Sequence, residues 1–487
     1  MRICFACDLH LPFDTRALQY DVLDWAVEDI SKSGSDCVIL AGDATCDGNE
    51  SSYDLFIKTV SRLNLPFLYI PGNADLRCKQ TRDSISSKSS LCKNIVKGTK
   101  IYAINDCDGT VSPQQLSLLE EADSESIVFM HHPLKAHDKA CVTDLLRWRT
   151  THPQTMLFYG HLHYFAWEGA SVSLPAMDPD KSIGEAPSIL YYDTGTKAVC
   201  RSYYPVPTSD ALSDYFGISC YRPLEQIKFA AEKGLKYLEL RPSCVNVERN
   251  ALVRLINEWR AAGGEKLSVH LPDVGYSDGT VIFDAGYDEA LETVSLLKAD
   301  RVTQHVPKVS VDTVKNDPRA LTEICQALAA RFNRISHAVT VGVENMHMTA
   351  KDTADGRRRF GYTPEECIDF MRILAEYCRH RVGINFDIGH ARNNAPYSQT
   401  YQISTWFSML GEHIVGYHMH QVTNDNGKFE NHMPITQIYG SLISLASFLK
   451  CWETGRINKA PIIFEMRPQD AYEKTLAAFA ESAIPKK

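Results

Sequence analysis

The feature that most constrains this chain is a short apolar run, rich in β-branched and aromatic residues, which ends abruptly in Asp, His, Glu or Asn. The run recurs from one end of the chain to the other, and such runs are typical of buried strands. Because the polar side chains follow the apolar runs, we expect buried sheets whose strand ends form polar edges. A chain of 487 residues is long enough for two or three domains, each with its own core.

The N-terminal part of the chain, residues 1–206, repeats this run with amphipathic segments between the early copies. One such segment, Leu18–Ser31, carries apolar residues at helical spacing. The later runs lie closer together, which is typical of hairpins. The pattern predicts an α/β fold, an αββα sandwich of two sheets with helices outside. The expected strands are Arg2–Cys7, Cys37–Ala41, Phe67–Ile70, Lys100–Ile104, Ile127–Met130, Met156–Tyr159 and Ile189–Tyr192.

After a proline-containing linker at 207–213, the rhythm becomes a strict alternation of strand and helix. Eight such units in about 270 residues are the count and size of a (β/α)8 TIM barrel, which we place at 214–487. The expected strands are Phe216–Cys220, Tyr237–Arg241, Leu267–Leu271, Arg301–Val306, Thr340–Glu344, Val382–Asp387, Ile414–His420 and Pro461–Met466. The expected helices include Pro223–Lys233, Pro318–Phe332, Pro364–Cys378 and Ile435–Trp452.

In the N-terminal part, the residues that end the strands are Asp, His and Asn, several of them beside glycine. Strand ends meet at one edge of a sheet, so these side chains can surround a common point. Carboxylate and imidazole groups suit Mn, Fe, Zn or similar divalent ions. Glycine lets the chain turn sharply and lets the backbone approach a phosphate. The motifs are Asp8-Leu9-His10, Gly42-Asp43, Gly72-Asn73-Ala74-Asp75, His131-His132-Pro133 and Gly160-His161-Leu162-His163.

This series of motifs resembles the calcineurin-like metallophosphoesterase family over residues 1–205. The resemblance implies phosphoester hydrolysis, of the phosphodiesterase type, at a dinuclear metal site. Two divalent ions would activate water for in-line attack on phosphorus and stabilise the charge on the transferring group. The implied ligands are Asp43 as the bridge, Asp8, His10 and His163 for one ion, and Asn73, His131 and His161 for the other.

One position departs from the family pattern. Many members carry histidine after the motif asparagine, where it can protonate the leaving group, but this chain has Ala74. General-acid help of this kind contributes roughly 10²–10⁴-fold. Our hypothesis is that the enzyme favours substrates with good leaving groups, or that it recruits another acid such as His132.

Nearly every expected barrel strand also ends in an acid or a histidine, at the carboxyl ends where barrel chemistry sits. Unpaired charges clustered inside a barrel would be strongly destabilising, and divalent cations would remove that cost. Glu239, by contrast, could be paired with Arg241 or a lysine instead of serving in catalysis. The polar residues at this rim are Glu239, His270, His305, Glu344, Asp387, His390, His418, His420 and Glu465, with Glu430 and His432 in the loop after the seventh strand.

The second half resembles the xylose-isomerase-like barrels over residues 214–480, a superfamily of sugar-phosphate isomerases, epimerases and the endonuclease IV group. The resemblance implies a four-ligand metal core of Glu344, Asp387, His418 and Glu465. In isomerase members the two glutamates, here Glu344 and Glu465, also move protons. The substrate-binding histidine of these members corresponds to His390.

The endonuclease IV group adds ligands for a three-metal site, and candidates for these positions exist here too. A full set argues for phosphate-ester chemistry, whereas the sequence around Asp387 is closer to that of isomerases. One to three metals in the barrel, and either an isomerase or a phosphoesterase, are therefore open. The additional candidates are His270, His305, His390, Glu430 and His432.

Arginine side chains near this rim are candidates for substrate binding. Their forked donors suit phosphate oxygens, although a basic run is more often a solvated loop. The candidates are Arg357, Arg358, Arg359 and Arg467.

The composition of the chain limits the kinds of partner and compartment that we expect. The net charge of −9 argues against a nucleic-acid-binding protein, which usually shows a basic face. No apolar stretch is long enough to span a membrane. The 15 cysteines are scattered, and we expect buried free thiols in a reducing, cytoplasmic compartment. We expect a bifunctional enzyme for a phosphorylated small molecule, with a nucleic-acid repair enzyme that combines two metallonuclease domains as the alternative.

Overall fold

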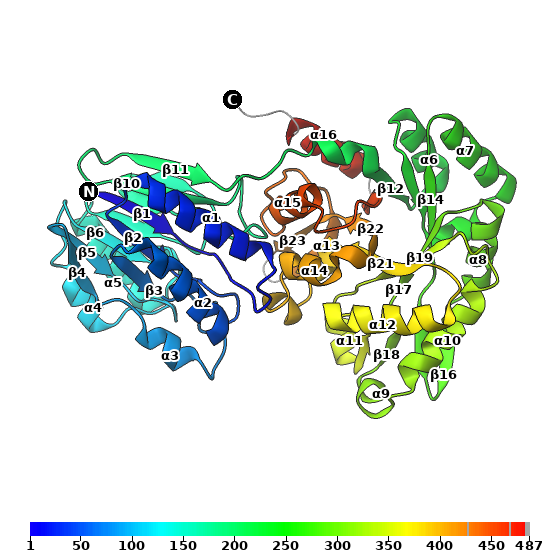
Figure 1. The fold of residues 1–487 in the computed structure, drawn as a ribbon, viewed down its shortest axis with the longest axis horizontal. Coiled ribbons are helices and arrows are strands. Elements are labelled where there is room, and N and C mark those ends of the chain that lie inside the picture. The colour runs from blue at the N-terminus through cyan, green and yellow to red at the C-terminus, as the bar shows by residue number, and fades with distance from the viewer. Residues whose placement is uncertain (426–427, 467–468, 483–487) are drawn as a thin grey trace. The chain divides into compact units, whose positions relative to one another are not determined.

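In the computed structural model, which describes residues 1–425, 428–466 and 469–482, the chain forms two compact units (Figure 1). The first unit comprises Met1–Val206 together with Tyr439–Phe448. The second unit comprises Pro207–Ile438 and the chain from Leu449 onward. The first unit therefore includes a segment from far along the chain.

The first unit is built on two sheets, and β1 (Arg2–Ala6) pairs in parallel with β2 (Cys37–Ala41) near the middle of one of them. The five-stranded sheet has the order β11 (Val199–Tyr203), β10 (Ser188–Asp193), β1, β2, β3 (Phe67–Ile70). The six-stranded sheet has the order β4 (Lys93–Val96), β5 (Thr99–Ala103), β6 (Ile127–Met130), β7 (Met156–Tyr159), β9 (Ser171–Ser173), β8 (Ala166–Glu168). The helices are α1 (Leu18–Ser33), α2 (Glu50–Val60), α3 (Arg82–Ser87), α4 (Pro113–Leu119) and α5 (Lys139–Thr151).

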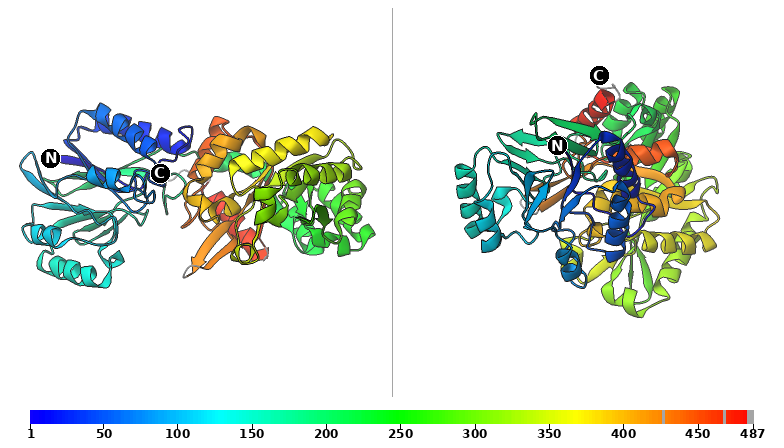
Figure 2. Two further views of the ribbon diagram at one scale, coloured as in Figure 1. Left: turned by 90° about the horizontal axis from the view of Figure 1, so that it is seen from below. Right: turned by 60° about the vertical axis from the view of Figure 1, so that its left-hand side comes forward.

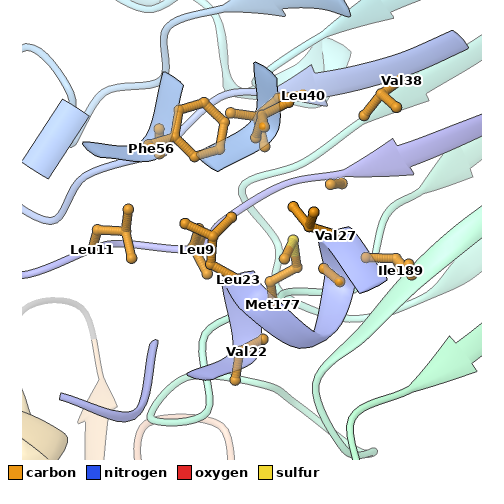
Figure 3. Close-up of a cluster of buried hydrophobic side chains, with 14 of the residues drawn as sticks. Leu9, Leu11, Val22, Leu23, Val27, Val38, Leu40, Phe56, Met177 and Ile189 are labelled. Carbon is orange, nitrogen blue, oxygen red and sulfur yellow. The ribbon is translucent and has the colours of Figure 1, made fainter. Parts of the chain in front are cut away.

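Three apolar clusters separate the layers of this unit. One fills the space between α1, α2 and the five-stranded sheet, with Leu23 and Leu40 among its residues (Figure 3). The second lies between the two sheets, where the rings of Phe5 and Phe158 stack at 4.0 Å. The third includes Trp148 of α5. Helix, sheet, sheet and helix thus form four layers, and the predicted αββα sandwich is confirmed.

The second unit is a closed barrel of eight strands, each paired in parallel with its neighbours (Figure 2). The predicted TIM barrel is therefore confirmed. The strands are β12 (Phe216–Cys220), β13 (Tyr237–Leu240), β14 (Lys266–His270), β17 (Arg301–His305), β19 (Thr340–Glu344), β21 (Val382–Asp387), β22 (Ile414–Met419) and β25 (Ile462–Phe464). The longer helices are α6 (Pro223–Glu232), α7 (Arg249–Ala261), α8 (Tyr287–Leu296), α10 (Ala320–Phe332), α12 (Pro364–Tyr377), α14 (Ile403–Leu410), α15 (Ala446–Thr454) and α16 (Gln469–Ser482).

Short strands elaborate the loops that follow the barrel strands. The predicted basic loop is a strand, β20 (Arg357–Arg359), which pairs with β18 (Lys308–Ser310). The same small sheet contains β15 (Val274–Ser277) and β16 (Thr280–Phe283). A separate hairpin joins β23 (Gln421–Asp425) to β24 (Lys428–Met433) after β22. Among the described residues, no helix is both long and apolar enough to cross a membrane.

The predicted helix Ile435–Trp452 is wrong over its first half, because α15 begins only at Ala446. The backbone before α15 bonds to a loop of the first unit instead of forming a helical ladder. The amide of Ser444 donates to Asp180 O at 3.2 Å, and the Tyr439 carbonyl accepts from Gly184 N at 2.9 Å. The buried apolar residues of this segment follow helical spacing by chance, and tertiary partners decide its conformation.

Two candidate metal centres

The first centre forms where five strands of the first unit end. Loops after β1, β2, β3, β6 and β7 supply the seven side chains that the sequence proposes as ligands. Backbone bonds hold the first two loops together, since Asp8 N donates to Gly42 O at 3.1 Å and His10 N donates to Asp43 O at 2.9 Å. The structure brings all seven together: Asp8, His10, Asp43, Asn73, His131, His161 and His163.

Asp43 occupies the centre of this group. Its Oδ2 atom lies 3.1 Å from His10 Nε2 and 3.5 Å from His131 Nε2, so one oxygen faces both halves of the site. On one side, His163 Nε2 lies 3.4 Å from Asp8 Oδ1. On the other, Asn73 Oδ1 lies 3.1 Å from His131 Nε2. This is the geometry required of a carboxylate that bridges two ions.

Left-handed backbone is concentrated in these loops. Residues other than glycine adopt positive φ only where the surrounding structure enforces it, and such positions cluster at functional sites. Gly42 has φ +92°, and a Cβ atom there would lie 2.3 Å from His131 Nδ1. The candidate ligands with φ between 51° and 69° are Asp8, His10, Asp43, His161 and His163.

Two carboxylates that the sequence reading missed orient the imidazoles of this centre. Asp178 Oδ2 lies 3.3 Å from His10 Nδ1. Asp106 accepts the backbone amides of His131 and His132, both at 2.8 Å. Such outer partners fix ring orientation at metal sites. Asp106 follows β5 closely, so its strand-end position was a usable signal, whereas nothing in the sequence marks Asp178.

The electrostatics of the first centre favour a cation. Burial alone would raise the pKa of Asp43, but His131 and His10 hold it well below its usual range. Burial lowers the pKa of His131, yet the neighbouring carboxylates, Asp43 first, raise it to about 10. Burial, together with His131 and His132, lowers the pKa of His161 to about 4. The Oδ1 atom of Asp8 is buried without a hydrogen-bond partner among the described residues. The donor set therefore fits divalent ions.

The second centre lies at the carboxyl ends of the barrel strands. Three groups of side chains each bring their ligand atoms within 4.8 Å of one another. Glu344, at the end of β19, belongs to two of the groups and so joins them. The groups are His270, His305 and Glu344; then Glu344, Asp387, His418 and Glu465; then His390, His420 and His432.

In the first barrel group, two imidazole nitrogens face each other. His270 Nδ1 lies 3.0 Å from Leu271 O and His305 Nδ1 lies 2.6 Å from Asp273 Oδ1, which places the N–H of each ring on Nδ1. The two Nε2 atoms are then left 3.1 Å apart, each 3.5 Å from a Glu344 oxygen. Two facing lone pairs repel, so this pair of nitrogens needs either a proton on His305 or a metal cation between them.

The middle group encloses His418. Its Nδ1 atom lies 3.0 Å from Glu344 Oε2 and 2.8 Å from Glu465 Oε2, and no hydrogen-bond partner for it is found within residues 1–425, 428–466 and 469–482. Glu465 is held from behind by Arg241 at 2.6 Å and by the hydroxyl of Tyr221 at 2.8 Å. Arg241 therefore pairs with Glu465 and not with Glu239. Sequence reasoning named Arg241 only as a possible partner of Glu239, and it did not identify Tyr221.

The third group corrects one prediction. Glu430 was expected beside His432, but its side chain is exposed and pairs with Lys428 Nζ at 2.9 Å. His432 has φ +62° in a hairpin with a register shift, so the two residues do not share a face as they would in a regular strand. His420, immediately after β22, completes the group, with Nε2 3.3 Å from Asp387 Oδ1.

The arginine candidates are also corrected. Arg359 is nearly buried and pairs with Asp273 at 2.5 Å, so it supports the carboxylate that orients His305. Arg358 pairs with Glu366. Only Arg357 presents an exposed side chain, and Arg467 lies outside the described residues.

The barrel centre also fits divalent ions, because several of its buried polar atoms have no hydrogen-bond partner among the described residues. Burial lowers the pKa of His305, but Glu344 and Asp273 raise it to about 9. Burial raises the pKa of Asp387, but His390 and His420 lower it to about 2. Atoms buried here without a hydrogen-bond partner among the described residues are Glu344 Oε1, Asp387 Oδ2, His418 Nδ1, His420 Nε2 and Glu465 Oε2.

Comparison with known families matches both halves of the chain. Residues 227–482 match the xylose isomerase-like TIM barrel family. Residues 1–174 match the calcineurin-like phosphoesterase superfamily domain. The two matches together span both candidate centres.

Among curated proteins, two relatives match part of this chain. One, named "Probable cyclic nucleotide phosphodiesterase", from Fibrobacter succinogenes, is 28% identical over 139 residues, which is 26% of this chain and 54% of the relative. A protein of the same name from Pseudoalteromonas is 29% identical over 187 residues, 34% of this chain and 71% of the relative. This chain thus matches only about half the length of the first relative.

Among solved structures, a xylose isomerase domain protein from Alicyclobacillus acidocaldarius aligns with 54% of this chain and 95% of its own, at 15% identity and a TM-score of 0.39. A dimetal phosphatase from Danio rerio aligns with 39% of this chain and 92% of its own, at 13% identity and a TM-score of 0.30. Likeness this distant does not bear on mechanism.

Proposed function

This chain belongs to the xylose isomerase-like TIM barrel family, with a calcineurin-like phosphoesterase domain ahead of the barrel, and from that premise we propose a bifunctional metal-dependent enzyme for phosphorylated small molecules. The first unit would hydrolyse a phosphodiester. The barrel would cleave a phosphoester of the same or a linked compound. The single observation that carries the proposal is that both rims bring imidazole and carboxylate atoms within ligand distance of one another, with buried oxygens such as Asp8 Oδ1 and Glu344 Oε1 lacking hydrogen-bond partners among the described residues.

In the first unit, Asp43 would bridge two divalent ions of the Mn, Fe or Zn type. Bound there, two such ions supply an activated water and stabilise the charge on phosphorus. The side chains hold the geometry: Asp178 fixes the His10 ring, and Asp106 fixes the His131 backbone.

His132 is the candidate proton donor of the first unit. Ala74 is buried, and its backbone amide donates to Asp43 Oδ1 at 2.7 Å, so this position offers no acidic side chain. The ring of His132 lies 4.6 Å from that of His161, with Nδ1 3.0 Å from Asp106 O. Its Nε2 atom is then available for a leaving oxygen.

Cyclic nucleotides are the substrate class we favour for the first unit. The printed name of both curated relatives supports this choice. A cyclic diester also keeps its leaving oxygen tethered, which suits a site with limited acid assistance. The net charge of −9 favours a small substrate over a long polyanion.

For the barrel, the first and third groups favour phosphoester cleavage. An isomerase needs only the middle group of Glu344, Asp387, His418 and Glu465, whereas the other two groups add imidazole sites on either side of it. Several ions around one pocket can stabilise both the attacking and leaving oxygens of a displacement. The complete middle group keeps a single-metal isomerase or epimerase as the second candidate.

Metal content separates the two candidates. Elemental analysis of the purified protein should give about five ions per chain, two in the first unit and three in the barrel. About three would favour an isomerase barrel. Substitution Asp387→Asn should lower the count in the barrel and leave the first unit loaded, which assigns each ion to its unit.

Substrate assays test the proposed activities. The metal-loaded protein should hydrolyse bis(p-nitrophenyl) phosphate and cyclic nucleotides, and Asp43→Asn should abolish this. Efficient metal-dependent incision of a duplex with an abasic site would instead support a repair enzyme. We also propose a cytoplasmic location, since all 15 cysteines are free thiols.

A further inference from the structure

A cavity of about 390 Å³ opens at the mouth of the barrel opposite the metal centre. It is lined by the first residues of several strands, Tyr237 of β13, Lys266 of β14, Arg301 of β17 and Thr340 of β19 among them. The candidate ligands all lie at the other ends of these strands. Sites for small molecules occupy cavities of roughly 300–1,000 Å³, so this one is large enough for a small metabolite.

The lining of this cavity is strongly basic. Lys266, Arg381 and Lys459 contribute exposed cationic side chains, and no ion pair is found for them among the described residues. Arg301 adds a fourth positive charge. The only lining carboxylate is Asp300, which accepts the backbone amide of Leu267 at 2.9 Å. Four positive charges face one negative charge on a protein whose overall charge is −9.

Arg301 is the buried member of this set, with 7% of its side chain exposed. Its Nη1 atom donates to Val415 O at 3.0 Å, but Nη2 has no hydrogen-bond partner among the described residues. Glu239 Oε2 lies 3.6 Å from Nη2, which is close enough for an ion pair but beyond hydrogen-bonding distance. The guanidinium therefore has a counter-charge, but its Nη2 donor lacks a hydrogen-bond acceptor among the described residues, which is costly for a buried group.

The fold makes space for this guanidinium. A Cβ atom on Gly416 of β22 would lie 1.3 Å from Arg301 Nη1, so only glycine is compatible with the observed side chain. Glu239 supplies the counter-charge that a buried arginine needs, and the space left by Gly416 keeps the guanidinium at the cavity.

We propose that this cavity is a second ligand site, specific for small phosphate-bearing anions and separate from both metal centres. Because Glu239 offsets the charge of Arg301, the three exposed cations against Asp300 leave an excess of two positive charges, which matches a phosphate dianion better than a single carboxylate. Arginine and lysine are the side chains that proteins use for phosphate oxygens. The alternative is a solvated opening whose lysine and arginine side chains bind no specific ligand.

The test is residue-resolved acylation of lysines in the zinc-loaded full chain, with inorganic phosphate as the probe. Phosphate should slow modification of Lys266 and Lys459 severalfold and leave Lys228 and Lys233, on α6 and just after it, unchanged. The same protection should persist in Asp387→Asn, because the site does not use the barrel ions. Equal rates with and without phosphate at Lys266 and Lys459 would overturn the proposal.

Calorimetric titration with phosphate gives an independent readout. The variant Lys266→Gln/Arg381→Gln/Lys459→Gln should lose one binding event, or bind phosphate at least about tenfold more weakly, with metal content unchanged. Its charge-matched control is Lys228→Gln/Lys233→Gln/Arg372→Gln on the outer helices. Loss of affinity in both variants, or in neither, contradicts a specific site. All substituted side chains are exposed, so both proteins should fold.

Discussion

The Nε2 atom of His418 lies 2.8 Å from Glu239 Oε1, while Nδ1 of the same ring faces two further carboxylates. Glu239 thereby accepts the Nε2 proton of His418, so that Nδ1 would be the atom offered to a metal ion. The hydroxyl of Thr303 donates to Glu239 Oε2 at 2.6 Å and holds the carboxylate in place. Burial raises the pKa of Glu239, but His418 lowers it to about 2, so the group is charged at neutral pH. Glu239 is a positioning residue for the barrel centre.

Glu239→Gln should weaken binding of the middle barrel ion by about 10–100-fold, because the amide cannot orient and polarise His418 as the carboxylate does. Metal content after dialysis against a graded chelator measures the effect. Glu289→Gln, an exposed carboxylate on α8, is the control and should retain full metal content. Equal retention in both variants would show that Glu239 only fills space.

His132→Gln should separate substrates by leaving group. Loss of a proton donor should slow hydrolysis of a poor leaving group by about 10²-fold or more, and should scarcely affect a p-nitrophenyl ester, whose leaving group needs no proton. Rates with methyl and p-nitrophenyl phosphodiesters measure the split. A uniform loss across both substrates would assign His132 to metal binding, with the neighbouring His131 and His161.

Metal binding should release protons. In the empty protein the pKa of His131 is about 10 and that of His305 about 9, so both rings carry a proton at pH 7 that an ion must displace. Apparent affinity should therefore rise as the pH rises from 6 to 9. Calorimetry in buffers of different ionisation enthalpy counts the protons. Binding without proton release would contradict this account.

His420→Gln and Glu430→Gln distinguish the two candidates for the third barrel group. The first substitution should remove about one ion per chain, and the second should remove none, because Glu430 is exposed and paired with Lys428. Elemental analysis of both proteins decides the matter. The opposite pattern would restore Glu430 as the ligand.

Gly389→Ala should disturb the same group. A Cβ atom there would lie 1.9 Å from His420 Cε1, so the imidazole must move, at a cost of about 1–3 kcal/mol in unfolding free energy. Loss of one ion and a lowered Tm should appear together. Gly275→Ala is the control, since its nearest contact would be an ordinary 3.4 Å. Wild-type metal content in Gly389→Ala would contradict the observed packing.

Strand ends were readable from the sequence because an apolar run and the polar group after it are both local signals. Strands such as Cys37–Ala41 and Val382–Asp387 match the prediction at both ends. The predicted strand ends also indicated which residues lie at the two rims, because neighbouring parallel strands end at the same edge of a sheet.

What escaped prediction depends on backbone and tertiary detail. His420 replaces Glu430 because His432 adopts a left-handed conformation in an irregular hairpin, which no periodicity reveals. Asp178 reaches His10 from a loop 168 positions along the chain, and no local pattern announces such a partner. The side chain of Arg359 is buried and not solvated, because it forms an ion pair with Asp273.

The segment Tyr439–Phe448 has a consequence for synthesis of the protein. Met1–Val206 emerges from the ribosome long before Tyr439 is translated. The first unit therefore cannot be completed until most of the barrel has been synthesised. During that interval the backbone hydrogen bonds from Ser444 N to Asp180 O and from Gly184 N to Tyr439 O cannot form. The order of translation therefore ties completion of the first unit to synthesis of most of the barrel.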